Sequence, residues 1–305
     1  MKTVYYPHDG REDLPRACYA LGFFDGVHIG HRRLIAECVK MAGELGLVPA
    51  VFTFSSEGEE LKRGAPRLTS TAEKLSIFAE MGVELAVVAD FSAVSGLTPR
   101  EFVADLLVAR HGCRGALSGE GFRFGRGASG DASELVALLG EHSLPAVIVE
   151  DILYTGAPIS STRIREALGG GDMTLVRELL GRPYSVSGIV SHGNGMGNKI
   201  GIPTVNIAIN ANNPLQNGVY ASRVRLGERS FAGITNVGTC PTLGERERHS
   251  ETLIFDFCED AYGAAVTVEL LKFLRPERCF RGVSDLLLQV NEDIRRAKEY
   301  VGKMD

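Results

Sequence analysis

The feature that most limits the fold of this 305-residue chain is a change in its hydrophobic pattern near residue 183. Before that point, short apolar runs alternate with segments whose apolar residues recur at helical spacing, as in the segment 31–46. Such alternation predicts an α/β domain with a Rossmann-like parallel sheet, in which ligands bind beyond the carboxyl ends of the strands. The predicted strands are 16–23, 47–54, 84–91 and 144–151.

The second part of the chain begins after a Gly-Arg-Pro sequence, 181–183, which breaks the preceding helical pattern. Six short strand-like runs follow, separated by Gly, Asn and Pro, and they predict an antiparallel sandwich or barrel. An amphipathic segment, 283–301, predicts a final helix that packs on this sheet. We therefore expect two domains, 1–182 and 183–305. The six runs are 184–193, 204–210, 218–227, 229–238, 251–257 and 264–274.

The composition argues against several classes of protein. The net charge is −5, which does not suit a protein that coats nucleic acid or an anionic membrane. The chain has no run of 18 apolar residues and its first residues lack the apolar core of a signal peptide, so we expect a cytoplasmic protein. The six cysteines include no Cys-x-x-Cys pair, which favours reduced thiols over disulfides or a zinc site. The oligomeric state does not follow from the sequence.

The sequence GFFDGVHIGH (22–31) follows the first predicted strand and leads into a predicted helix. Its glycines allow close approach of the backbone to a ligand, and the free N–H groups of the helix start favour an anion such as phosphate. His28 and His31 could donate hydrogen bonds to phosphoryl oxygens as charge develops during a reaction. The pattern is also compatible with a surface hydrogen-bond network, and no third ligand at a diagnostic spacing indicates a metal site.

A second polar segment, ISSTRIREAL (159–168), lies near the end of the first predicted domain. It places Ser160, Ser161 and Thr162 ahead of two arginines. This order is typical of a Ser/Thr cap followed by a basic helix start. It is also suitable for a clamp in which hydroxyl and guanidinium groups hold a triphosphate.

The sequence GNGMGNKIGIPTVNI (193–207) places a glycine-rich loop ahead of a strand in the second domain. Such a loop can wrap phosphates with backbone amides, or it can be a long hairpin whose glycines only turn the chain. Thr204 and Asn206 alternate along the strand and therefore face the same side. Their oxygens are suitable ligands for Mg²⁺ beside a phosphate.

Together with GFRFGRGASGD (121–131), the two motifs of the first domain resemble the nucleotidyltransferase superfamily and, more narrowly, the N-terminal half of bacterial bifunctional riboflavin kinase/FAD synthetases. The resemblance implies transfer of AMP from ATP to FMN, which gives FAD and pyrophosphate. The nucleophile is already an anionic phosphate, so alignment and charge neutralisation matter more than a general base. By this resemblance, His28, His31 and Arg165 are catalytic. Phe122 and Phe124 lie near the flavin, unless they only pack in the core. The implied nucleotide contacts are Gly22, Phe24, Asp25, Gly26, Gly30, Ser160, Ser161 and Thr162.

The second domain resembles the riboflavin kinase module of the same family, because GVYASRV, GITNVGTCPTLG, ETLIFDF and LRPERCF follow the glycine-rich loop in that order. The resemblance covers nearly the whole chain and implies a six-stranded antiparallel barrel that phosphorylates riboflavin with ATP and Mg²⁺. The attacking ribityl hydroxyl must lose a proton, and Glu251 matches the family's base. The implied partners are small molecules: ATP, riboflavin and FMN. Thr204 and Asn206 are implied to bind Mg²⁺, and Arg275 is implied to contact the flavin. The implied nucleotide contacts are Gly195, Gly197, Lys199, Gly201, Pro203, Thr204 and Asn206.

Some positions depart from the family pattern. The segment SSEGEE (55–60) stands where the family usually has a Pro-His-Pro-like sequence, and Gly121 replaces an Asp. Gly197-Asn198 replaces a Gly-Arg, although Lys199 could restore the positive charge. These differences leave two alternatives open: a riboflavin kinase whose adenylyltransferase domain is weakly active or inactive, and a flavin- or nucleotide-binding regulator without catalysis. A regulator would have no need to keep a catalytic base.

Overall fold

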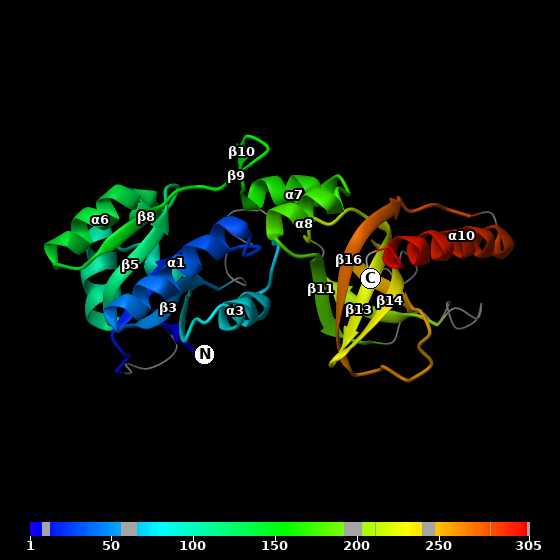
Figure 1. Cartoon of the computed structure of the whole chain (residues 1–305), viewed down its shortest axis with the longest axis horizontal. Helices are drawn as coiled ribbons and strands as arrows, with labels where there is room; N and C mark the ends of the chain where they lie inside the picture. Colours follow the sequence, from blue (N-terminus) through cyan, green and yellow to red (C-terminus); the bar gives the residue numbers. More distant parts are fainter. Residues whose placement is uncertain are drawn as a thin grey trace. The chain divides into compact units, whose positions relative to one another are not determined.

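The computed structural model of the chain divides into two compact units, Met1–Ser161 and Thr162–Asp305 (Figure 1). It describes residues 1–7, 13–55, 66–191, 203–210, 212–239, 248–280 and 282–303. Helices α7 (Ser161–Gly169) and α8 (Met173–Leu180) therefore fall almost wholly in the second unit, although the expected boundary at 182/183 places them in the first domain. The division of the two activities at 182/183 stays a prediction.

The first unit contains the expected parallel sheet, in the order β1-β4-β3-β2-β5-β8 (Figure 1). Its strands are β1 Lys2–Tyr6, β2 Ala17–Leu21, β3 Val48–Phe54, β4 Leu85–Ala89, β5 Cys113–Gly119 and β8 Ala146–Val149. Its helices are α1 Ile29–Leu45, α3 Thr71–Glu80, α4 Phe91–Val94, α5 Pro99–Glu101, the π-helix η1 Phe102–Arg110, the 3₁₀ turn η2 Arg126–Ala128 and α6 Ala132–Glu141.

Helices cover both faces of this sheet. Cys18 and Ala20 of β2 pack in a core with α1 and α3, whereas Tyr19 and Leu21 pack in a second core with η1 and α6. A strand buried on both faces has no reason to alternate apolar and polar residues. This explains why the strands appear in the sequence as continuous apolar runs.

The connection of the strands opens a crevice at one end of the sheet. The chain passes from β2 to β3 and β4 on one side, and then crosses to β5 on the other side of β2. The loops that follow β2 and β5 therefore diverge, as at the ligand-binding switch point of an open α/β sheet. Two short hairpins lie near this end: β6 Arg123–Phe124 with β7 Gly130–Asp131, and β9 Leu153–Tyr154 with β10 Ala157–Pro158.

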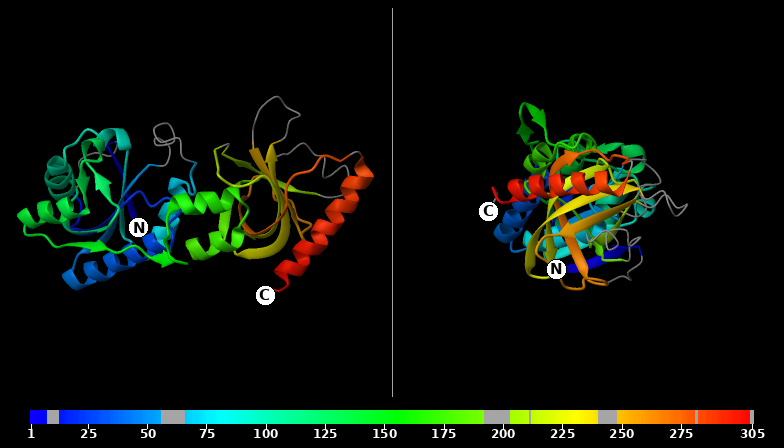
Figure 2. Two further views of the ribbon diagram at one scale, coloured as in Figure 1. Left: turned by 90° about the horizontal axis from the view of Figure 1, so that it is seen from above. Right: turned by 90° about the vertical axis from the view of Figure 1, so that its right-hand side faces the viewer.

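The second unit contains the expected six-stranded antiparallel barrel, which is visible in Figure 2. Its strand order is β11-β16-β13-β14-β15-β12. A bridge between Ser191 and Asn206 brings the two outer strands together, so the sheet is nearly closed. The sandwich that the strand pattern also allowed is therefore not formed. The elements are β11 Tyr184–Ile189, β12 Val205–Ile209, β13 Gly218–Leu226, β14 Arg229–Thr239, β15 Arg248–Ile254, β16 Ala265–Arg275 and α10 Val283–Val301.

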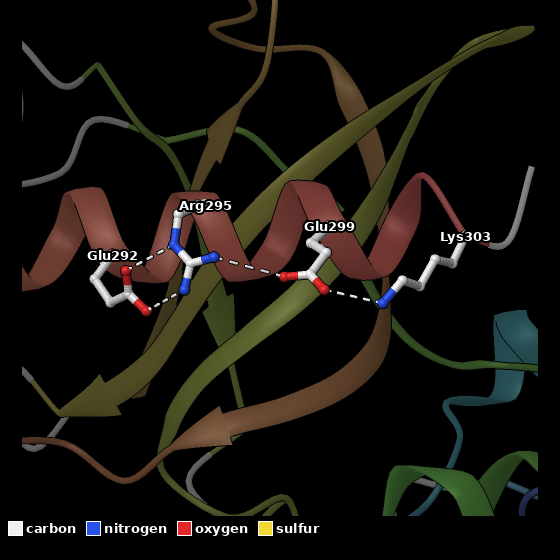
Figure 3. Close-up of polar contacts among 4 residues, drawn as sticks. All are labelled: Glu292, Arg295, Glu299 and Lys303. Atoms are coloured by element: carbon white, nitrogen blue, oxygen red, sulfur yellow. Dashed lines mark hydrogen bonds and ion pairs between the residues drawn. The ribbon is translucent and has the colours of Figure 1, made fainter.

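The final helix packs on the outside of the barrel, as the sequence predicts. Ala297 of α10 lies in a core with Ile234 of β14, and Leu253 of β15 packs against that core. The helix is also held by a buried ion pair, in which Arg275 Nη2 lies 2.7 Å from Asp293 Oδ2. The outer face of α10 has a row of ion pairs instead, from Glu292 and Arg295 through Glu299 to Lys303 (Figure 3). Because these four side chains are exposed, they contribute little to stability and mark the solvent face.

His111 gives the first unit a stability that depends on pH. Its side chain is buried beside Phe52, and neither ring nitrogen has a hydrogen-bond partner among the described residues. Burial, with a smaller effect of Arg110, lowers the pKa of His111 from 6.5 to about 4. The unfolded chain therefore binds a proton first as the pH falls, so the free energy of unfolding decreases between pH 6.5 and pH 4.

We expect this histidine to lower the free energy of unfolding by about 2 kcal/mol between pH 7 and pH 5, because the imidazole must stay neutral in the core. Urea unfolding at both pH values measures the difference. His111→Phe should reduce the dependence on pH by that amount, whereas His142→Phe, at an exposed position, should leave it unchanged. Equal pH dependence in the wild type and His111→Phe would contradict this assignment.

Candidate active sites

A cleft of about 830 Å³ opens at the carboxyl end of the parallel sheet in the first unit. Its lining comes from the residues that follow β2, β3, β4, β5 and β8, which is the position that the strand order predicts. The sequence-predicted residues in this lining are Gly22, Phe24, His28, Gly30, His31, Phe122, Phe124, Ser160 and Ser161. One cleft thus brings together three motifs that are far apart in the sequence.

The turn between β2 and α1 has an unusual backbone. Phe24, Gly26 and Val27 have φ values of 56°, 81° and 39°. Only glycine adopts this region readily, so the two other residues are strained and need support from their surroundings. Asp25 provides it: Oδ1 accepts hydrogen bonds from the backbone N–H of Leu68 at 3.0 Å and of Thr69 at 3.2 Å.

Two more hydrogen bonds fix the same turn. The N–H of Gly26 donates to Thr69 Oγ1 at 3.0 Å. Ser161 Oγ donates to the carbonyl oxygen of Asp25 at 2.8 Å, which joins the turn to the second polar motif across 136 residues of chain. Asp25 and Gly26, predicted as nucleotide contacts, thus support the turn and are absent from the cleft lining. A direct contact of either residue with a nucleotide stays a prediction.

His28 and His31 stand at the start of α1. Nδ1 of His28 accepts a hydrogen bond from the N–H of His31 at 3.3 Å and so caps the helix. The two rings are stacked, with centroids 3.5 Å apart and planes 17° apart. Because Nδ1 of His28 is an acceptor, a neutral His28 ring has its proton on Nε2.

The electrostatics of the pair favour an uncharged His31. Burial lowers the pKa of His31 well below its ordinary value, with further contributions from His28 and Lys74. Nδ1 of His31 is buried without a hydrogen-bond partner among the described residues. A neutral imidazole donates one hydrogen bond and adds its dipole to the N–H groups of the helix start, which suits an anionic oxygen.

Aromatic side chains form a separate wall of the cleft. The rings of Phe122 and Phe124 are stacked with centroids 5.6 Å apart, and Phe124 also lies 5.2 Å from Phe102. Phe124 is buried in the core and still lines the cleft, so the two roles weighed for it are compatible. The sequence reasoning missed Phe54 and Phe91, which end β3 and follow β4; their positions at strand ends were the available signal.

The remaining residues of the 159–168 motif lie beyond the boundary of the first unit. Thr162, Arg163 and Arg165 are in α7, in the part of the chain that belongs to the second unit. Their contact with a nucleotide in the cleft therefore stays a prediction.

The second unit brings Asn206 and Glu251 together across the sheet. These residues are direct partners in the β12–β15 register, so their side chains leave the same face. On the other side of β15, Asn236 of β14 is also a direct partner of Glu251. Glu251 thus stands between two asparagines, of which the sequence reasoning found only one. No pattern within β14 marks Asn236, because the register alone places it there.

The carboxylate of Glu251 is partly buried, on the face of β15 that also carries Leu253. Burial raises the pKa of Glu251, and His249 has a smaller opposite effect. A raised pKa makes this carboxylate a better proton acceptor while it remains ionised near neutral pH. The arrangement is therefore suitable for a general base.

Thr204 and Asn206 could hold a magnesium ion. They are two positions apart, but Thr204 lines a pocket of about 320 Å³ with Pro203 and Thr252 from which Asn206 is absent. A shared contact of Thr204 and Asn206 with Mg²⁺ therefore stays a prediction. The part of the chain that the structure describes has no cluster of three or more His, Cys, Asp or Glu side chains that could hold a metal. Hydroxyl and amide oxygens are ligands that Mg²⁺ accepts beside water and phosphate oxygens.

The structure does not test two groups of predicted contacts in the second unit, those of the glycine-rich loop with the nucleotide and that of Arg275 with the flavin. Gly195, Gly197, Lys199 and Gly201 lie outside the described residues. Arg275 is described: its Nε donates to Asp293 Oδ2 at 2.8 Å and its Nη1 to the Pro276 carbonyl at 3.0 Å. Much of its hydrogen-bonding capacity is thus used within the protein, and its contact with a flavin stays a prediction.

Known proteins resemble the chain over its whole length. The family model for FAD synthetase matches residues 11–163, and the model for riboflavin kinase matches residues 180–301. The bifunctional riboflavin kinase/FMN adenylyltransferase of Bacillus subtilis is 31% identical over 100% of this chain and 99% of its own length. The Escherichia coli K12 protein of the same description is 34% identical over 99% and 98%. The chain belongs to the riboflavin kinase/FMN adenylyltransferase family.

A solved structure of another protein shares the fold of this chain. The crystal structure of a Streptococcus pneumoniae protein, described as a macrolide-efflux protein, has a TM-score of 0.84 and 28% identity. It covers 97% of this chain, and the alignment includes 98% of the pneumococcal chain. In the described residues of the present family member, no helix is long and apolar enough to cross a membrane.

We expect Asp25→Ala to lower the free energy of unfolding by about 1–3 kcal/mol, because two buried N–H groups of residues 68 and 69 would lose their acceptor. Urea unfolding at pH 7 measures this change. Asp105→Ala, at an exposed position, serves as the control and should change the value by less than about 0.5 kcal/mol. An Asp25→Ala protein as stable as this control would show that the turn is supported elsewhere.

Proposed function

We propose that the second unit phosphorylates riboflavin to FMN and that the first unit transfers AMP from ATP to FMN, with release of pyrophosphate. The observation that supports this most strongly is the presence of both site geometries in one chain. Paired histidines face a cleft at a helix start in the first unit, and a partly buried carboxylate stands between asparagines in the second. The proposal includes a cytoplasmic location, as the composition predicts, and small molecules as the partners, as the family resemblance implies.

In the adenylyl transfer, a phosphate oxygen of FMN attacks the α-phosphorus of ATP, and the bond to the β-phosphate oxygen breaks. The leaving pyrophosphate gains negative charge, which His28, His31 and the N-terminus of α1 can stabilise by hydrogen bonds. The nucleophile is already ionised, so the reaction needs no base, and a neutral His31 can act as a hydrogen-bond donor. The aromatic wall around Phe122 and Phe124 suits the flat ring system of the flavin.

In the kinase reaction, Glu251 takes the proton of a ribityl hydroxyl while the oxygen of that hydroxyl attacks the γ-phosphorus of ATP. Asn206 and Asn236, on either side of Glu251, can hold the carboxylate or the neighbouring hydroxyls by hydrogen bonds. Mg²⁺ bound by Thr204 and Asn206 would neutralise charge on the phosphates. Glu251 needs its ionised form for this step, so its raised pKa helps only while it stays below the working pH.

The alternative of an inactive first unit has two observations in its favour, the altered 55–60 segment and Gly121, which lies in the cleft lining. One experiment separates the candidates. Purified protein is incubated with riboflavin, ATP and Mg²⁺, and the flavins are separated by chromatography. We expect FMN followed by FAD. FMN alone would support the kinase with an inactive adenylyltransferase, and unchanged riboflavin would support a non-catalytic regulator.

Glu251→Gln and His31→Ala should each slow a different one of the two reactions. Loss of the base in Glu251→Gln should slow FMN formation by about 10²–10⁴-fold and leave the conversion of supplied FMN to FAD unchanged. Loss of one hydrogen-bond donor in His31→Ala should slow only FAD formation, by about 10²-fold. Each step is measured separately by flavin chromatography at saturating ATP.

The exposed residues Glu228 and His142 provide matched controls for this pair of variants. Glu228→Gln and His142→Ala should leave both rates at the wild-type value. If Glu251→Gln or His31→Ala slowed both steps equally, the two reactions would not have separate sites.

A further inference from the structure

Lys74 is buried in the interior of the first unit, with 1% of its surface exposed. It lies on α3, on the face that also buries Phe78 four residues later. A buried ammonium group loses its hydration, so such a position is unfavourable unless polar partners replace the water. The sequence reasoning gave this residue no role, and neither reaction described above uses it directly.

The polar partners of Lys74 come from two strand ends. Nζ donates hydrogen bonds to the carbonyl oxygen of Phe54 at 2.9 Å and of Phe23 at 3.2 Å. Thr53 Oγ1, 3.5 Å from Nζ, donates to the same Phe23 carbonyl at 3.0 Å. The ammonium group also lies 4.8 Å from the centre of the Phe23 ring. Lys74 therefore joins the residues that follow β2 to the end of β3.

These two strand ends form part of the cleft. Phe23 and Phe54 both line it, and their rings are stacked with centroids 6.4 Å apart. Lys74 is absent from the lining, and its hydrogen bonds reach the cleft through Phe23 and Phe54. Carbonyl groups at the carboxyl ends of parallel strands have partial negative charge at the edge where an anionic nucleotide would bind. A cation that binds two of these carbonyls offsets that charge.

We propose that Lys74 is a positioning residue for adenylyl transfer: it fixes the ends of β2 and β3 beneath the cleft and offsets the carbonyl charge that would repel the phosphates of ATP. This inference rests on the proposed function of the first unit. Lys74 also supplies positive charge close to His31 and helps to keep that imidazole neutral. The residue does not touch substrate, so its effect is on geometry and electrostatics.

The test compares Lys74→Met, which keeps the length of the side chain but removes its charge, with Lys74→Arg, which keeps the charge. FAD formation from supplied FMN is measured over a range of ATP concentrations. We expect Lys74→Met to lower kcat about 10- to 100-fold, because the reacting groups lose their alignment. Lys74→Arg should recover part of that loss. Lys40→Met, at an exposed position of α1, is the matched control and should have the wild-type kcat.

An NMR titration of the His31 ring in the full chain provides a readout that a purely structural role would not change. Removal of the Lys74 charge in Lys74→Met should raise the pKa of His31, and Lys74→Arg should leave it near the wild-type value. This titration also separates the two proposals, since it does not need a reaction. A wild-type protein that makes no FAD would refute the adenylyl transfer, whereas an unchanged His31 pKa in Lys74→Met would refute the electrostatic part of the role of Lys74.

A further variant keeps the inference testable if Lys74→Met does not fold. Thr53→Val removes the hydroxyl that contacts both Nζ and the Phe23 carbonyl but keeps the charge. We expect a 2- to 10-fold lower kcat for FAD formation, with FMN formation in the second unit unchanged as the internal standard. A wild-type kcat in Thr53→Val, or in a folded Lys74→Met, would overturn the proposal.

Discussion

The hydrogen bonds that converge on the turn between β2 and α1 are the constraint on which the first unit depends. Phe24 and Val27 occupy backbone conformations that no sequence preference favours, and the turn forms only because other segments hold it. Asp25 binds the backbone of residues 68 and 69, and Ser161 binds the Asp25 carbonyl. These contacts place the start of α1, with its two histidines, at the open end of the sheet.

This explains how far the sequence could predict the first unit. Apolar runs predicted β2, β3 and β4, because strands buried on both faces leave that pattern, and they also predicted the edge strand β8, whose Val147 and Ile148 are exposed. They did not reveal β5, which reads Cys-Arg-Gly-Ala-Leu-Ser-Gly and has only one large apolar residue. The family motif identified Asp25 and Ser161 as site residues. Only the structure shows that Ser161 donates to the Asp25 carbonyl and that Asp25 accepts from the backbone of residues 68 and 69, since those hydrogen bonds join residues 136, 43 and 44 positions apart.

In the barrel too, the local pattern predicts the strands, whereas the pairing register decides which residues meet. Gly- and Asn-separated runs predicted six strands, but this pattern is common to a sandwich and a barrel. The bridge from Ser191 to Asn206, which nearly closes the sheet, identifies the barrel. Alternation along the predicted strand 204–210 placed Thr204 and Asn206 on one face without showing what lies opposite them. The β14–β15 register then adds Asn236 to the site. Residues that meet across strands are set by pairing, which a single sequence does not encode locally.

The departures from the family pattern affect the polarity of the first cleft more than its shape. A side chain at Gly121 would extend into open space, since nothing lies within 4 Å of an added Cβ. The glycine there is not required by packing, and its presence removes a polar group without changing the shape of the cleft. The features that depend on shape, namely the stacked histidines, the aromatic wall and the turn with its supports, are all in place. A carboxylate at position 121 would add negative charge to the lining of the cleft. The glycine therefore lacks that charge, while the histidines that we propose to stabilise the leaving pyrophosphate keep their arrangement.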